Sequence, residues 1–301
     1  MPAPYHRLVD DAAVFPPGSL ALDAAVAAHR QHRDADYRDL VGPFVVSDVA
    51  LPDLLELLGP DGAPDPLAVA VVVTGGAGAI EPAARWAGRA EQIELAALEL
   101  SLRDEEDLQR NARRVTTVIE QLRGSGDLPD ETPVYVELPR PAGPGPSMSW
   151  LAALDEVAAL ELRVKFRTGG VTADTFPGAA ELATCIDAAL DRELPFKCTA
   201  GLHHALRHRD GGTGFEHHGF LNVLLATRAA WDGADVDDTS RILELEDAES
   251  LRSTMEEAGD AGLVSARRWF TSLGSCSVRE PVEDLATLGL LTGSATPPRH
   301  S

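Results

Sequence analysis

Lysine is almost absent from this chain. Only two of its 26 basic residues are lysines, Lys165 and Lys197, and all the others are arginines. Arginine therefore supplies nearly all the positive charge, and each lysine is a candidate for a task that the permanently charged guanidinium group cannot perform. One such task is the loss of a proton in a desolvated site, followed by attack of the amine on a carbonyl group.

Other scarcities argue against whole classes of protein. Three cysteines without a CxxC pair provide no disulfide framework, and they indicate free thiols in a reducing cytoplasm. No apolar run reaches the roughly 18 residues of a membrane-spanning helix, and the first residues lack the apolar core of a signal peptide. The net charge of −22 disfavours nucleic acid and anionic membranes as partners. We therefore expect a cytoplasmic protein that acts on a small molecule, and the sequence leaves room for a homo-oligomer.

Eight apolar runs alternate with patterns of helical spacing. The runs occupy residues 6–14, 42–49, 66–76, 92–102, 133–139, 162–170, 195–201 and 269–277. Eight strand and helix units in series predict a (β/α)8 TIM-type barrel, because an open doubly wound sheet usually has fewer strands.

We expect one barrel domain over residues 1–292 and a disordered tail over residues 293–301. Residues 202–263 form an insertion after the seventh strand that is too long for one crossover. We expect this insertion to contain a His-rich loop, helices near residues 219–231 and 248–258, and an acidic loop at residues 232–240.

The active sites of such barrels lie at the carboxyl ends of the strands. Read at these positions, the sequence offers Lys165, Lys197 and Glu137 as catalytic candidates. The substrate-binding candidates there are Asp10, Asp11, Arg167, Thr168, Thr199, Gly274, Ser275 and Ser277. Side chains alternate along a strand, so Arg167 lies on the same side as Lys165. Neighbouring cations disfavour protonation of an amine, and we therefore expect Lys165 to be the nucleophile, with Lys197 tuning it.

The segments Val-Lys-Phe-Arg-Thr-Gly-Gly around Lys165 and Phe-Lys-Cys-Thr-Ala-Gly-Leu around Lys197 resemble the sixth and seventh strands of deoxyribose-phosphate aldolase and related class I aldolases. The run Leu-Gly-Ser-Cys-Ser, which starts at residue 273, is similar to the phosphate loop after the eighth strand of that family. The resemblance implies a Schiff base on Lys165, a tuning role for Lys197, and anion binding by the backbone of residues 274–277.

The sequence departs from this family pattern in three places. Phe166 and Arg167 replace the small hydroxyl residues that usually follow the sixth-strand lysine, and Glu99 is the possible counterpart of the fourth-strand aspartate. The insertion after the seventh strand is foreign to the pattern. The resemblance therefore leaves the substrate open.

Histidines gather in the insertion. Five of the nine lie between residues 203 and 218, namely His203, His204, His208, His217 and His218. Histidine transfers protons near neutral pH and binds metals, so His203 and His204 are further catalytic candidates. Metal binding, substrate contact and a solvated polar loop all stay open. We expect neither metal nor cofactor, because Ala205 stands where a zinc-protease motif has Glu and Thr74-Gly75-Gly76 lacks the GxGxxG register.

The leading hypothesis is therefore a lysine-dependent, Schiff-base lyase that acts on a small carbonyl substrate, with or without a phosphate group. One alternative is a metal-dependent barrel hydrolase or lyase that uses the His-rich loop. The other is a barrel that binds a small anionic ligand without turnover.

Overall fold

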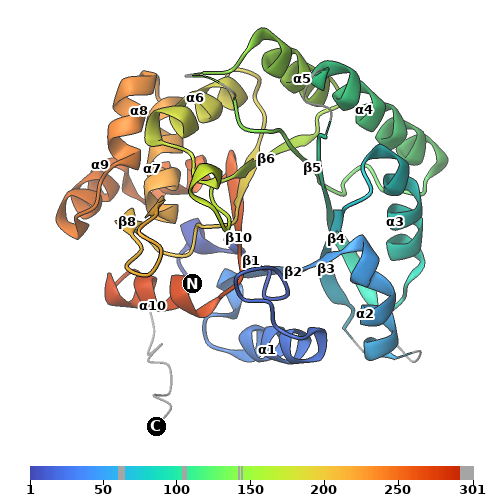
Figure 1. The fold of residues 1–301 in the computed structure, drawn as a ribbon. Helices are drawn as coiled ribbons and strands as arrows, with labels where there is room; N and C mark the ends of the chain where they lie inside the picture. The colour runs from blue at the N-terminus through green and yellow to red at the C-terminus, as the bar shows by residue number, and fades with distance from the viewer. Residues whose placement is uncertain (60–64, 104–106, 142, 144, 292–301) are drawn as a thin grey trace. The chain divides into compact units, whose positions relative to one another are not determined.

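The computed structural model describes residues 1–59, 65–103, 107–141, 143 and 145–291. Eight parallel strands form a closed barrel in the order β1-β10-β7-β6-β5-β4-β3-β2, which confirms the predicted TIM-type barrel (Figure 1). The barrel strands are β1 (Val9–Asp11), β2 (Val41–Ser47), β3 (Leu67–Val73), β4 (Ile93–Ser101), β5 (Val134–Glu137), β6 (Arg163–Arg167), β7 (Phe196–Thr199) and β10 (Phe270–Ser275). The predicted disordered tail lies outside the described residues.

Helices follow the strands along the chain. They are α1 (Leu22–Asp34), α2 (Leu51–Leu58), α3 (Ala77–Arg89), α4 (Leu108–Ser125), α5 (Met148–Ala159), α6 (Ala179–Leu190), α7 (Phe220–Trp231), α8 (Val236–Leu243), α9 (Ala248–Ala266) and α10 (Arg279–Thr287). Helix α4 shows how the sequence specifies them. Asp107 caps its first turn by accepting a hydrogen bond from the backbone of Arg110, and Gly126 ends it with a φ of 78°. In the described part of the chain, no helix has the length and apolar composition needed to cross a membrane.

The insertion after β7 contains more regular structure than the sequence predicted. A short antiparallel hairpin of β8 (His208–Arg209) and β9 (Glu216–His217) lies within the His-rich loop. The acidic loop expected at residues 232–240 is wrong from residue 236 onward, where helix α8 begins. Asp235 caps α8 by accepting from the backbone of Asp238, and acidic residues in a first turn stabilise a helix. The expected helix at residues 248–258 continues as α9, with a break at Gly259, whose φ is 64°.

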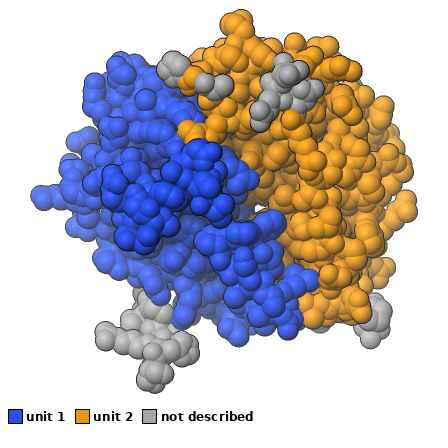
Figure 2. Space-filling view, viewed as in Figure 1, with its two compact units in different colours: residues 1–42, 167–187, 198–301 blue, residues 43–166, 188–197 orange. Residues whose placement is uncertain are grey.

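The contacts within the chain divide it into two compact units (Figure 2). Unit 1 contains residues 1–42, 167–187 and 198–301, and unit 2 contains residues 43–166 and 188–197. Both lysines belong to unit 2, whereas the His-rich loop and the segment 274–277 belong to unit 1.

Candidate active site

Both lysines lie on barrel strands and are buried. Lys165 is in β6 and Lys197 is in β7, and their exposed fractions are 3% and 1%. In β6, Val164 and Phe166 alternate with Lys165, and the ring of Phe166 packs 5.2 Å from that of Phe196 between centroids. Alternation along the strand therefore sends the lysine to the side opposite an apolar packing face.

Glu99 links the two lysines. This residue lies in β4, and one of its carboxylate oxygens, Oε1, is 2.5 Å from Nζ of Lys197. The other oxygen, Oε2, is 3.3 Å from Nζ of Lys165. Glu99 is 2% exposed, so the three side chains form a buried, charge-paired bridge across β4, β6 and β7.

A second carboxylate and an aromatic ring complete the cluster, which we call the lysine–glutamate cluster: Glu99, Tyr135, Glu137, Lys165 and Lys197. Glu137 is the strand partner of Lys165, and its Oε2 lies 2.9 Å from the lysine Nζ. Nζ of Lys197 lies 5.3 Å from the centroid of the Tyr135 ring, within the range of a cation–π interaction. The structure thus brings together three of the predicted catalytic residues.

The electrostatics of the cluster differ from the expectation. The sequence indicated two cations, Arg167 and Lys197, around Lys165, whereas the structure adds two carboxylates next to its amine. Burial raises the pKa of Glu99, but the charges of Lys197 and Lys165 and their hydrogen bonds outweigh burial and lower it to about 2. Glu99 is therefore ionised at neutral pH. Arg167, at the end of β6, is exposed and belongs to unit 1.

Glu99 is the residue of the cluster whose importance the sequence indicated least clearly. It was noted only as a counterpart of an aspartate in the resembled family. The alternation along β4 carried a usable signal, because Glu99 stands between the buried apolar residues Leu98 and Leu100. A carboxylate at such a position requires a partner, but the sequence does not show which of the 26 basic residues provides it.

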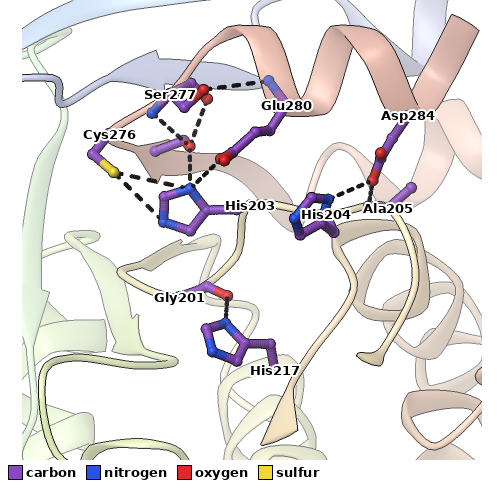
Figure 3. A network of polar contacts seen from close by, with 10 residues as sticks. Gly201, His203, His204, Ala205, His217, Cys276, Ser277, Glu280 and Asp284 are labelled. Atoms are coloured by element: carbon purple, nitrogen blue, oxygen red, sulfur yellow. Dashed lines mark hydrogen bonds and ion pairs between the residues drawn. The ribbon is translucent and has the colours of Figure 1, made fainter. Parts of the chain in front are cut away.

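Unit 1 holds a second polar network, which surrounds His203 (Figure 3). Nδ1 of His203 lies 2.8 Å from the carboxylate of Glu280 and 3.2 Å from Oγ of Ser275. The sulfur of Cys276 lies 3.8 Å from Nε2 of the same ring. Burial alone would lower the pKa of His203, but hydrogen bonds to Cys276 and Glu280 raise it to about 9. His203 is therefore an imidazolium at neutral pH.

The neighbouring His204 is held by a different carboxylate. Its Nδ1 lies 3.1 Å from Oδ2 of Asp284, which also accepts a hydrogen bond of 2.7 Å from the backbone of Ala205 (Figure 3). The hydrogen bond to Asp284 raises the pKa of His204. Helix α10, which carries Glu280 and Asp284, thus fixes the first turn of the His-rich loop.

The remaining histidines of the loop bind to backbone. His217 contacts the carbonyl of Gly201 at 3.1 Å, and His218 contacts that of Pro177 at 2.9 Å. Burial lowers the pKa of His218 to about 4, so it is neutral. Among the described residues, no group of three or more histidine, cysteine, aspartate or glutamate side chains is arranged to hold a metal ion.

The other predicted binding residues of unit 1 are engaged within the fold. Asp10 accepts a hydrogen bond of 2.7 Å from Ser272, and Asp11 pairs with His29 at 3.0 Å, with all four side chains buried. Thr168 donates to the carbonyl of Ala200 at 2.6 Å. Thr199 packs near Gly274: its Oγ1 is 3.3 Å from the position that a Cβ on this glycine would take. Substrate binding by these residues stays a prediction.

No protein-family model and no curated protein matches the chain. Among solved structures, the chain is similar to deoxyribose phosphate aldolase from Aeropyrum pernix, which has a unique tetrameric structure. The TM-score is 0.54 at 13% identity, and the match covers 96% of this chain and 93% of the aldolase. The two proteins share the barrel fold. At this identity the likeness establishes the fold, and it agrees with the resemblance in the lysine segments.

Proposed function

We propose that this protein is a class I lyase of the aldolase kind, which forms a Schiff base with a small carbonyl substrate. The observation that carries the proposal is the buried position of Lys165 between Glu137 and Glu99, with Glu99 also bound to Lys197. An amine beside carboxylates that can accept its proton, in a desolvated site, is equipped for nucleophilic catalysis.

The chemistry follows from the charges of the cluster. Nζ of Lys165 transfers a proton to Glu137, which lies 2.9 Å away, and the amine then attacks the carbonyl carbon. Glu137 returns this proton to the oxygen, takes a second proton from the nitrogen, and passes it to the resulting hydroxyl group, which leaves as water. The resulting iminium ion carries the same charge as the ammonium group that it replaces. Glu99 and Glu137 therefore stabilise this intermediate as they stabilise the resting lysine, and the buried site need not accept an extra charge.

Lys197 has a supporting role in this proposal. Its ammonium group is bound to Glu99 at 2.5 Å and is 1% exposed. It holds Glu99 ionised, and it can pass a proton through Glu99 towards the carbon next to the imine. Lys165 is assigned as the imine-forming residue because its Nζ contacts two carboxylates, Glu137 at 2.9 Å and Glu99 at 3.3 Å.

Borohydride trapping tests the proposal. The protein is incubated with a panel of small aldehydes and ketones, reduced with borohydride, and its intact mass is measured. We expect a covalent adduct that disappears in Lys165→Arg and persists at a lower rate in Lys197→Arg. Loss of the adduct only in Lys197→Arg would reverse the roles of the lysines. If the wild-type protein gives no adduct with any carbonyl compound, the Schiff-base function is wrong and ligand binding without turnover takes its place.

We extend the proposal to a phosphorylated substrate, and we propose that within unit 1 the backbone of Gly274, Ser275 and Ser277 binds an anion such as phosphate. This segment leads into α10, and helix starts bind anions. The His203 imidazolium beside Ser275 offsets the charge of Glu280. Trapping with phosphorylated and unphosphorylated forms of one aldehyde tests this extension, since a preference for the phosphorylated form is expected.

We also propose a homo-oligomer, because the structurally similar aldolase is tetrameric, and light scattering tests it.

A further inference from the structure

Cys276 differs from the two other cysteines in its surroundings. Cys185 and Cys198 are buried, with exposed fractions of 5% and 0%, whereas Cys276 is half-buried. None of these three described cysteines is part of a disulfide. Cys276 directly follows β10. Because it is more exposed than the two other cysteines, a reagent from solvent reaches this thiol first.

The sulfur of Cys276 lies beside a fixed imidazolium (Figure 3). It is 3.8 Å from Nε2 and 3.9 Å from Nδ1 of His203, whose orientation is set by Glu280 at 2.8 Å and Ser275 at 3.2 Å. A positively charged ring held against a sulfur atom is the arrangement that makes a protein thiol nucleophilic. The carboxylate of Glu280 orients the His203 ring.

Cys276 also lines a cavity of about 460 Å³ in unit 1. The lining includes Asp11, His32, Tyr37 and Arg279, together with apolar residues such as Leu20. The volume falls within the range of about 300 to 1,000 Å³ typical of small-molecule sites. Room for a bound group therefore exists next to the sulfur, and Arg279 provides a cation in a protein whose net charge is −22.

We propose that Cys276 is a modification site, a thiol that exchanges with disulfides of small thiols that enter this cavity. The sulfur of Cys276 attacks one sulfur of the small disulfide, the bond between the two reagent sulfurs breaks, and a mixed disulfide forms. The His203 imidazolium donates a proton to the departing sulfur, which leaves as one equivalent of small thiol, and the ring takes up the proton that Cys276 loses. Cys276 is oxidised by this exchange, and the reagent is reduced by the same two electrons.

The test uses the whole protein under native conditions with two reagents, the uncharged dithiodipyridine and the anionic dithiobis(nitrobenzoate). Released thiol is followed by absorbance, and the modified peptide is identified by mass. We expect one fast equivalent, mapped to Cys276, that is absent in Cys276→Ala and unchanged in the matched control Cys185→Ala. A fast equivalent that maps elsewhere, or a rate no higher than that of a free cysteine peptide, would overturn the proposal.

Two further variants test the role of the imidazolium. His203→Gln removes it and Glu280→Gln releases it, and we expect both to lower the exchange rate of Cys276, by about tenfold for His203→Gln. Thermal melts confirm that each variant is folded, and the mapped wild-type reaction stands independently of both. Folded variants with wild-type exchange rates would show that His203 does not activate the thiol. None of these outcomes depends on imine formation at Lys165, so the exchange and the proposed lyase activity succeed or fail separately.

Discussion

Glu99 and Lys197 form a buried ion pair, with 2.5 Å between Oε1 and Nζ and no more than 2% of either residue exposed. Taking two charges out of water is costly, and a buried pair repays the cost only through close contact. Both lysines of the chain and a buried glutamate of β4 belong to one such cluster. Apolar side chains at these positions would stabilise the fold as well as or better than the ion pair. The presence of the charges therefore favours a chemical role.

Replacing Glu99 by glutamine should strongly destabilise the fold. The variant leaves Lys197 charged and buried beside an amide, and breaking a buried pair costs about 3–5 kcal/mol. Urea unfolding measures the change. Glu94→Gln is the matched control, since Glu94 is exposed on the same strand and should change stability by less than about 0.5 kcal/mol. Equal effects of the two substitutions would show that the pair contributes little.

Acid should weaken the protein through the same residue. The pKa of Glu99 is about 2 in the folded protein against an ordinary value of 4.5. A carboxyl group with a lowered folded pKa stabilises the fold above its unfolded pKa, and this contribution fades as the pH falls from 4.5 towards 2. Above pH 4.5, the lowered pKa of Glu99 contributes about 3 kcal/mol to the free energy of unfolding. The free energy of unfolding should fall more steeply in this window for the wild type than for Glu99→Gln, and parallel curves would contradict the assignment.

The barrel could be predicted from the sequence because its signals are local. The run Leu67–Val73 is apolar on both faces, and turn residues separate it from the next helix. Helix α8 was missed because its aspartates suit a loop as well as a capped first turn, and only the cap of Asp235 decides between them. The contact of Cys276 with His203 joins residues 73 positions apart, and no local pattern records such a pairing.

The titration of His203 should depend on Glu280. Burial alone lowers its pKa, but partners raise it to about 9 from 6.5, so the pair stabilises the fold fully below pH 6.5 and loses this contribution as the pH rises through 9. Glu280→Gln should lower the pKa of His203 by about one unit, as measured by NMR. Asp284→Asn is the control, because it should lower the pKa of His204 far more than that of His203. If the pKa of His203 is the same in Glu280→Gln as in the wild type, the pairing of His203 with Glu280 is wrong.

Glu137 should control the rate of imine formation without holding the fold as firmly as Glu99. Its Oε2 lies 2.9 Å from Nζ of Lys165, whereas the carboxylate of Glu99 bridges both lysines. Glu137→Gln keeps the shape of the side chain and removes the proton acceptor, so trapping by borohydride should slow by about 100-fold, the size of a proton-transfer contribution. Initial trapping rates at saturating aldehyde measure this effect, and a urea melt reports stability in parallel. If Glu137→Gln traps at the wild-type rate while a folded Glu99→Gln does not, the proton acceptor is Glu99 and the roles of the two carboxylates are exchanged.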